Sequence, residues 1–140
     1  MSFREEFIRR TKKIYLEDVM HNRARRSAEE MIYKYFDSLK KELKEEIEIS
    51  SGELDIDIAE REFVRVNLDL SELFFELETA DIEVRLISYD GNEKVEKLID
   101  RITYKNNEYI SVSYSVPLSY ELLDLYLRKA FEKELNQFGV

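Results

Sequence analysis

The feature that most constrains the fold of this chain is a change in the spacing of its apolar residues near position 54. Between residues 3 and 47 apolar residues recur every three or four positions, as in Ile32, Phe36 and Leu39, which is typical of amphipathic helices. From Leu54 they alternate with polar residues, which is typical of strands with one face on a core. Helical spacing returns after Ser119. The chain therefore predicts helices, then strands, then one helix.

Two helices are expected within residues 1–47. The first runs from Phe3 to about Met20, and the basic stretch His21 to Arg26 is interpreted as a hinge. Ser27 and Glu30 match a capping box, so the second helix is expected to begin there and to reach about residue 47. A single bent rod is the alternative to two separate helices.

Residues 48–118 predict an antiparallel meander of five or six strands. Turn residues at 90–92 and 105–107 favour hairpins. The segment 93–104 has helix-like spacing behind a hairpin-like turn, so helix and strand both remain open, and its second half is assigned to a strand. Apolar alternation from 110 to 116 predicts a last strand that Pro117 ends. Ser119 is expected to cap the C-terminal helix.

Together these elements predict one α+β domain over residues 1–140, helical in 1–47, mainly strands in 48–118, and helical in 119–140. The aromatic fraction of 12% and the apolar fraction of 44% are enough to form a core. Only three Gly and one Pro are present, so few residues interrupt the helices and strands. We expect the C-terminal helix to pack on the sheet, because each element must bury its apolar face.

The net charge of −9 is unevenly distributed. Residues 1–47 carry 12 basic and 10 acidic side chains, residues 48–118 carry 7 and 17, and residues 119–140 carry 3 and 4. The predicted sheet is therefore acidic and the first helices are locally basic. An acidic body opposes the ordinary binding of phosphate groups.

Catalytic motifs are scarce in the sequence. It contains no Cys, so disulfides and thiolate nucleophiles are excluded. It has no phosphate-binding glycine loop, nucleophile elbow or zinc-protease motif, and its single histidine, His21, has no flanking motif. We expect no catalytic residues, no metal site and no cofactor. No signal peptide or apolar span is visible, so a cytoplasmic location is expected.

Carboxylates crowd the predicted strands and suggest a surface that binds a partner. A row of them can complement a basic protein surface or imitate nucleic-acid phosphates. A merely solvated sheet face is the alternative interpretation. The residues assigned to this acidic surface are Glu53, Asp55, Asp57, Glu76, Glu78 and Glu83.

Four aromatic residues fall opposite the main apolar rows of their strands, namely Phe63, Phe74, Tyr89 and Tyr109. They either lie under a helix or contribute to an interface, where aromatic residues are favoured. Homodimer formation through this face, or through the long second helix, is a further expectation.

The first functional hypothesis is thus a non-enzymatic cytoplasmic binding or regulatory protein whose partner is a protein with a basic surface. The second is nucleic-acid binding through a basic patch, although these side chains could instead complement the acidic sheet. The third is a metal-dependent enzyme with strand carboxylates such as Asp55 and Glu83 as ligands. The basic patch comprises Arg9, Arg10, Lys12, Lys13, Arg23, Arg25 and Arg26.

Overall fold

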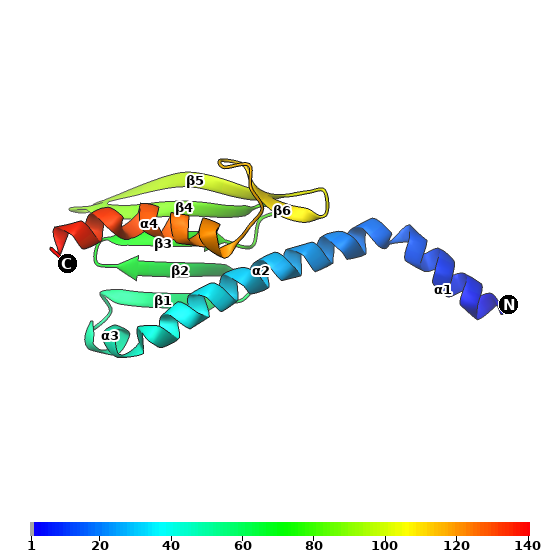
Figure 1. Cartoon of the computed structure of the whole chain (residues 1–140), viewed down its shortest axis with the longest axis horizontal. Helices are drawn as coiled ribbons and strands as arrows, with labels where there is room; N and C mark the ends of the chain where they lie inside the picture. Colours follow the sequence, from blue (N-terminus) through cyan, green and yellow to red (C-terminus); the bar gives the residue numbers. More distant parts are fainter. Residues whose placement is uncertain (1) are drawn as a thin grey trace.

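The computed structural model describes residues 2–140, which form four helices and a six-stranded antiparallel sheet (Figure 1). The helices are α1 (Phe3–Ile14), α2 (Leu16–Glu42), α3 (Lys44–Ile49) and α4 (Tyr120–Gln137). The strands are β1 (Leu54–Ala59), β2 (Phe63–Leu68), β3 (Ser71–Glu76), β4 (Ile82–Asp90), β5 (Glu93–Lys105) and β6 (Glu108–Ser111). They lie in the sheet in chain order. The predicted α+β fold, with its meander and C-terminal helix, is confirmed.

The break between the first two helices is at Tyr15, and the predicted hinge at residues 21–26 is wrong. Ser2 caps α1 by accepting a hydrogen bond from the amide of Glu5. The chain bends at Tyr15, and α2 then continues through the basic stretch for 27 residues. That stretch has no Gly or Pro, and Ala and Arg favour helices. Ser27, the predicted cap, lies inside α2.

Residues 93–105 form one long strand, β5, which resolves the ambiguity of that segment. Its helix-like spacing has a structural cause. Arg85 pairs with Leu98 while Val84 pairs with Asp100, so β5 has one extra residue at Ile99. Such a bulge shifts the alternation by one position, and Leu98 and Ile102 therefore lie on opposite faces of the sheet.

The last strand is shorter than predicted, because β6 ends at Ser111 and residues 112–116 do not continue it. Val112 still donates to the Arg101 carbonyl of β5 at 2.9 Å, but side chains replace the expected ladder partners of the next two residues. The amide of Ser113 donates to the Asp100 carboxylate at 2.9 Å, and the amide of Tyr114 donates to the Ser111 hydroxyl at 3.0 Å. Ser115 then adopts a positive φ of 56°. Polar side chains thus turn the backbone where apolar alternation predicted a strand.

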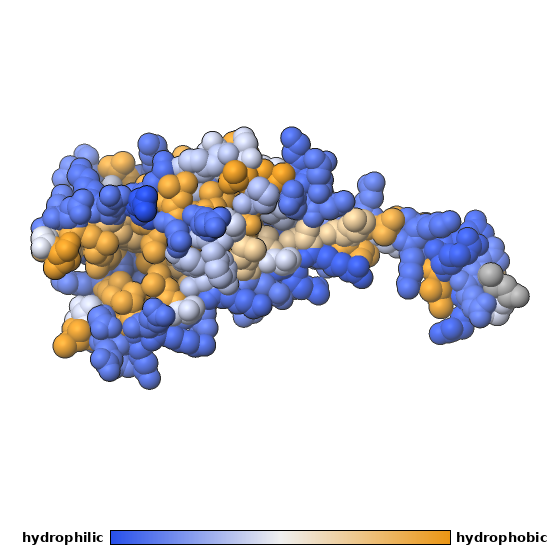
Figure 2. All heavy atoms as spheres, viewed as in Figure 1, coloured by the Kyte–Doolittle hydropathy of each residue, from blue (hydrophilic) through white to orange (hydrophobic). Residues whose placement is uncertain are grey.

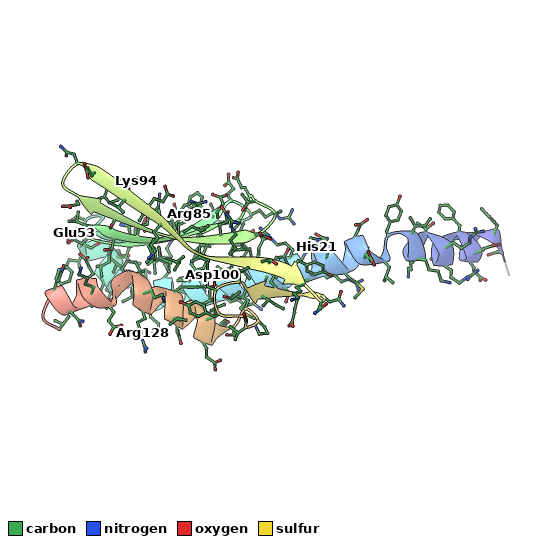
Figure 3. The ribbon with its side chains drawn as sticks, turned by 90° about the horizontal axis from the view of Figure 1, so that it is seen from above. His21, Glu53, Arg85, Lys94, Asp100 and Arg128 are labelled. Carbon is green, nitrogen blue, oxygen red and sulfur yellow. The ribbon has the colours of Figure 1, made fainter. Side chains whose placement is uncertain are left out.

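The core lies between the sheet and the helices α2 and α4, which cover the same face. Fully buried residues come from all three layers, including Phe36 of α2, Phe75 of β3 and Tyr126 of α4. The Phe75 ring lies between the other two, with its centroid 5.3 Å from that of Phe36 and 5.9 Å from that of Tyr126. Among residues 2–140 no helix lies over the opposite face of the sheet (Figures 1 and 3).

A buried carboxylate joins the end of the sheet to α4. Asp100, 3% exposed, accepts hydrogen bonds from the hydroxyls of Ser111 and Tyr126 and from the amides of Arg101 and Ser113. Burial by itself would raise the pKa of Asp100, but the hydrogen bonds from Ser111, Tyr126 and Ser113 outweigh it and lower this pKa below its ordinary value. The carboxylate is therefore charged in the folded protein.

The Asp100 cluster predicts a contribution to the pH dependence of stability. Because the pKa of Asp100 is lower in the folded than in the unfolded chain, its charge stabilises the fold above the unfolded value of about 3.9. This stabilisation is lost as the pH falls through the folded pKa. Urea unfolding of the wild type and of Asp100→Asn between pH 7 and pH 2.5 measures it. The stability difference should shrink toward low pH, and a constant difference would contradict the assignment.

Candidate partner surface on the uncovered face of the sheet

The strand register assembles three cross-strand rows on the uncovered face of the sheet. The first row is Asp55, Asn67, Glu72, Ile87 and Glu96, the second is Asp57, Arg65, Phe74, Arg85 and Leu98, and the third is Ala59, Phe63, Glu76, Glu83 and Arg101. Alternation along each strand places all of them opposite the core. Six of these side chains are carboxylates and three are guanidinium groups. The rows are named the sheet face below.

Ion pairs within and between strands order most of the charged groups on the sheet face. Arg65 lies 3.1 Å from Asp57 and 3.8 Å from Glu72. Glu83 lies 2.7 Å from Arg85 and 3.4 Å from Arg101. These pairs are partly exposed, so each contributes modestly to stability. Their main effect is to hold the long side chains in fixed positions.

Two carboxylates of the sheet face, Asp55 and Glu76, form no ion pair with any residue from 2 to 140. Glu76 accepts a hydrogen bond from the amide of Glu78 at 3.1 Å. Asp55 lies on β1, which is an edge strand, and Glu76 lies on β3. The negative charge that these groups carry is thus available to an approaching partner.

An aromatic pair lies within the charged rows. The rings of Phe63 and Phe74 stack with centroids 5.4 Å apart and planes inclined by 20°. The guanidinium of Arg65 lies over the Phe63 ring at 5.5 Å, a cation–π contact that also shields the ring. Both rings are half-buried. The sheet face therefore combines an apolar centre with an acidic surround, which resembles the core-and-rim composition of protein interfaces.

Glu72 illustrates the crowding on this face. Its side chain is 15% exposed, and this burial raises the pKa of Glu72 above its ordinary value, although Arg65 and Lys94 oppose the shift. The carboxylate is held against Arg65 on the neighbouring strand. Glu72 therefore belongs to the framework of the sheet face and is less suited than Asp55 to meet a partner.

The structure brings together only part of the predicted acidic surface. Asp55, Asp57, Glu76 and Glu83 share the sheet face. Glu53 precedes β1, and Glu78 lies in the β3–β4 loop, so both are outside the rows. The arginines Arg65, Arg85 and Arg101 were missed as parts of the surface. Their alternation with apolar residues was visible, but their pairing partners depend on the strand register.

Of the four predicted interface aromatics, only some lie on the sheet face. Phe63 and Phe74 lie in the rows, and Tyr89 is exposed near the end of β4. Tyr109 does not belong to this surface, because it is 4% exposed and packs in the core. Its hydroxyl bonds the His21 ring nitrogen at 2.9 Å, and the guanidinium of Arg25 lies 5.5 Å from its ring. Contact with α2 therefore explains Tyr109.

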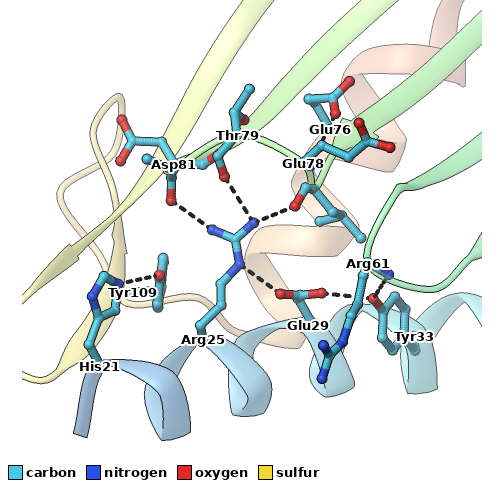
Figure 4. Close-up of polar contacts among 12 residues, drawn as sticks. His21, Arg25, Glu29, Tyr33, Arg61, Glu76, Glu78, Thr79, Asp81 and Tyr109 are labelled. Atoms are coloured by element: carbon cyan, nitrogen blue, oxygen red, sulfur yellow. Dashed lines mark hydrogen bonds and ion pairs between the residues drawn. The ribbon is translucent and has the colours of Figure 1, made fainter. Parts of the chain in front are cut away.

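Arg25 does not contribute to the predicted basic patch, because its guanidinium group forms hydrogen bonds with other residues of the same chain (Figure 4). Its guanidinium donates to the carbonyls of Leu77, Thr79 and Ala80 at 2.8–3.2 Å and to Glu29 at 2.7 Å. Burial by itself would lower the pKa of Arg25, but the hydrogen bonds with Glu29 and Tyr109 raise it. Arg25 thus fixes the β3–β4 loop to α2.

The remaining basic residues are spread over two regions. Arg9, Arg10, Lys12 and Lys13 lie on α1, whereas Arg23 and Arg26 are exposed on α2. His21, between them, stacks on the Tyr104 ring with centroids 4.0 Å apart. It packs α2 against β5 and hydrogen-bonds the Tyr109 hydroxyl. The structure therefore separates the basic patch instead of gathering it.

The carboxylates proposed as metal ligands are also apart. Asp55 is on β1 and Glu83 is on β4, three strand spacings away, which corresponds to about 14 Å. Within residues 2–140 no group of three or more His, Asp or Glu side chains is arranged to hold a metal ion.

Comparisons with known proteins add no family to this description. No family model matches the chain, and no curated protein or solved structure matches it either. Over residues 2–140 no helix has the length and apolar character that crossing a membrane requires.

Proposed function

We propose that this protein is a non-enzymatic binding or regulatory protein that holds a macromolecular partner on its sheet face. The observation that carries the proposal is the one-sided packing of the helices. It leaves four of the predicted acidic residues, Asp55, Asp57, Glu76 and Glu83, together on an uncovered face beside the Phe63–Phe74 pair.

The composition of the sheet face favours a protein partner with a basic surface. Carboxylates exceed guanidinium groups by six to three in the rows, so the face attracts positive charge. The aromatic pair supplies an apolar contact of the kind found at interface centres. The interspersed arginines interrupt a continuous row of negative charge. For this reason we favour a partner with an ordinary basic protein surface over one that binds nucleic acid in a basic groove. Mimicry of nucleic acid stays a prediction.

Charge reversal of the two carboxylates without ion pairs tests this proposal. Asp55→Lys together with Glu76→Lys should lower the affinity for a basic partner about tenfold or more, because both changes place like charges against it. Tagged wild type and variant are compared in pull-downs from nuclease-treated lysate of the source cell. The proteins retained are quantified by mass spectrometry.

The matched control is Glu48→Lys together with Glu132→Lys, which makes the same change in net charge on exposed positions of α3 and α4. A partner of the sheet face should be retained by this control and lost by the sheet-face variant. Equal retention by all three proteins would refute the proposal. Nucleic acid recovered from an untreated lysate, and lost with Arg23→Ala and Arg26→Ala, would favour the basic patch instead.

A further inference from the structure

The N-terminal arm, residues 3–19, extends away from the sheet and helices of the body (Figure 1). None of the residues of α1 is buried by any part of the chain from 2 to 140. Phe3, Phe7 and Ile14 are 74%, 59% and 72% exposed, and Leu16 and Val19 are exposed beyond the bend. Apolar side chains are visible at the surface of the arm in Figure 2. A row of exposed large apolar side chains marks an interaction surface.

Three of the four apolar residues of α1 form a single stripe, and Ile8 lies outside it. Phe3, Phe7 and Ile14 are separated by four and seven residues, which places them on one side of a helix. The rings of Phe3 and Phe7 are neighbours, with centroids 6.3 Å apart. A helix of 12 residues is marginal in water without a partner for its apolar side. The stripe therefore needs an occupant.

The charges of α1 identify what can occupy it. Glu5 and Glu6 lie in its first turn, and Lys12 and Lys13 lie in its last turn. Glu6 and Lys13 are seven residues apart, so they share one side of the helix, next to the stripe. In an antiparallel pair of α1 helices, Glu6 of each copy faces Lys13 of the other. A parallel pair would bring like-charged ends and like helix dipoles together.

We propose that the arm pairs in antiparallel orientation with the arm of a second copy of this chain. Large side chains such as Phe bury about 150–250 Å² each when they are fully enclosed. Full enclosure of the three stripe residues of both copies therefore gives at most on the order of 900–1,500 Å², whose upper part reaches the lower range of specific interfaces. An antiparallel pair is self-complementary, so it closes as a two-fold dimer.

The dimer is independent of the partner that the sheet face binds. The arm contributes no residue to the rows of the sheet face, and the body begins to contact α2 only near His21, which stacks on Tyr104. Asp55→Lys with Glu76→Lys should leave self-association unchanged. The two proposals can therefore fail separately.

Removal of the stripe is the first test. Sedimentation equilibrium of the wild type should show a monomer–dimer equilibrium in the micromolar range, roughly that expected for an interface of this size. Phe7→Asp should weaken it at least tenfold without changing the melting temperature, because the body does not bury Phe7. Phe138→Asp is the matched control, since Phe138 is 54% exposed and lies beyond α4. It should leave the dimer intact.

Charge exchange tests the orientation of the pair. Glu6→Lys alone and Lys13→Glu alone each place like charges opposite one another twice, and each should weaken the dimer roughly tenfold. An equimolar mixture of the two single variants should associate as a heterodimer, because lysines then face glutamates at both contacts. The double variant E6K/K13E should regain the affinity of the wild type.

The proposal is overturned if the wild type is monomeric at about 100 µM, some tenfold or more above a micromolar Kd. It is also overturned if the mixture and the double variant are as weak as the single variants. A monomer that binds vesicles of phosphatidylserine and phosphatidylcholine through Phe7 would show that the occupant of the stripe is a lipid surface instead of a second copy.

Discussion

Asp100→Ala should lower the free energy of unfolding by about 3–5 kcal/mol. The carboxylate accepts from two hydroxyls, of Ser111 and Tyr126, that are almost completely buried, and from two backbone amides. Alanine would leave these donors without their acceptor in the core, and it would also open a cavity. Urea unfolding at pH 7 measures the loss.

The control for Asp100 is Asp90→Ala, which removes an exposed carboxylate at the end of β4 and should change stability by less than about 0.5 kcal/mol. Tyr126→Phe removes a single donor and should cost about 1–2 kcal/mol. Combined with Asp100→Ala it should cost less than the sum, because the two changes break the same contact. A fully additive double variant would contradict the cluster as described.

Arg25→Met should destabilise the protein by about 2–4 kcal/mol. Methionine keeps much of the apolar stem but removes every donor, so the carbonyls of Leu77, Thr79 and Ala80 lose a shared partner. Glu29 loses its cation while it still accepts from the Tyr33 hydroxyl at 2.9 Å. Urea unfolding gives the stability, and hydrogen exchange should show faster opening of residues 77–81.

Arg23→Met is the matched control, since Arg23 is exposed on α2 two residues before Arg25. It should leave both stability and the exchange of the loop unchanged. Arg25→Lys should recover only part of the stability, because one ammonium cannot reproduce a planar fork that reaches four acceptors. Equal stability of the methionine and lysine variants would show that the carbonyl contacts contribute little.

The regular parts of the fold were predictable from apolar spacing, and the exceptions have local causes. Spacing located the part of α2 after Ser27, the alternating strands and the helix that Ser119 caps through the amide of Leu122 at 3.2 Å, but the basic stretch that was interpreted as a hinge lies inside α2. It failed at β5, where the bulge at Ile99 reverses the alternation. It failed again after Ser111, where side-chain hydrogen bonds turn the chain. Neither cause leaves a signal that is readable from spacing.

The candidate surface was predictable in its charge and not in its arrangement. The excess of acid in the strands indicated a negative face, and Asp55 and Asp57 could be assigned to one side of a strand. Which carboxylate meets an arginine of the neighbouring strand depends on register, as the contact of Glu83 on β4 with Arg101 on β5 shows. The role of Asp100 could not be predicted either, because its donors Ser111 and Tyr126 come from other elements.

The order of the strands has a consequence for how this chain reaches its native state. Each strand is hydrogen-bonded to its neighbour in sequence, so the sheet can grow one hairpin at a time. The entropy lost in closing each short loop is small compared with that of a long crossover. Contacts of low sequence separation also favour fast folding. The slowest requirement is then the docking of α2, whose Arg25 and His21 meet residues more than 50 positions later.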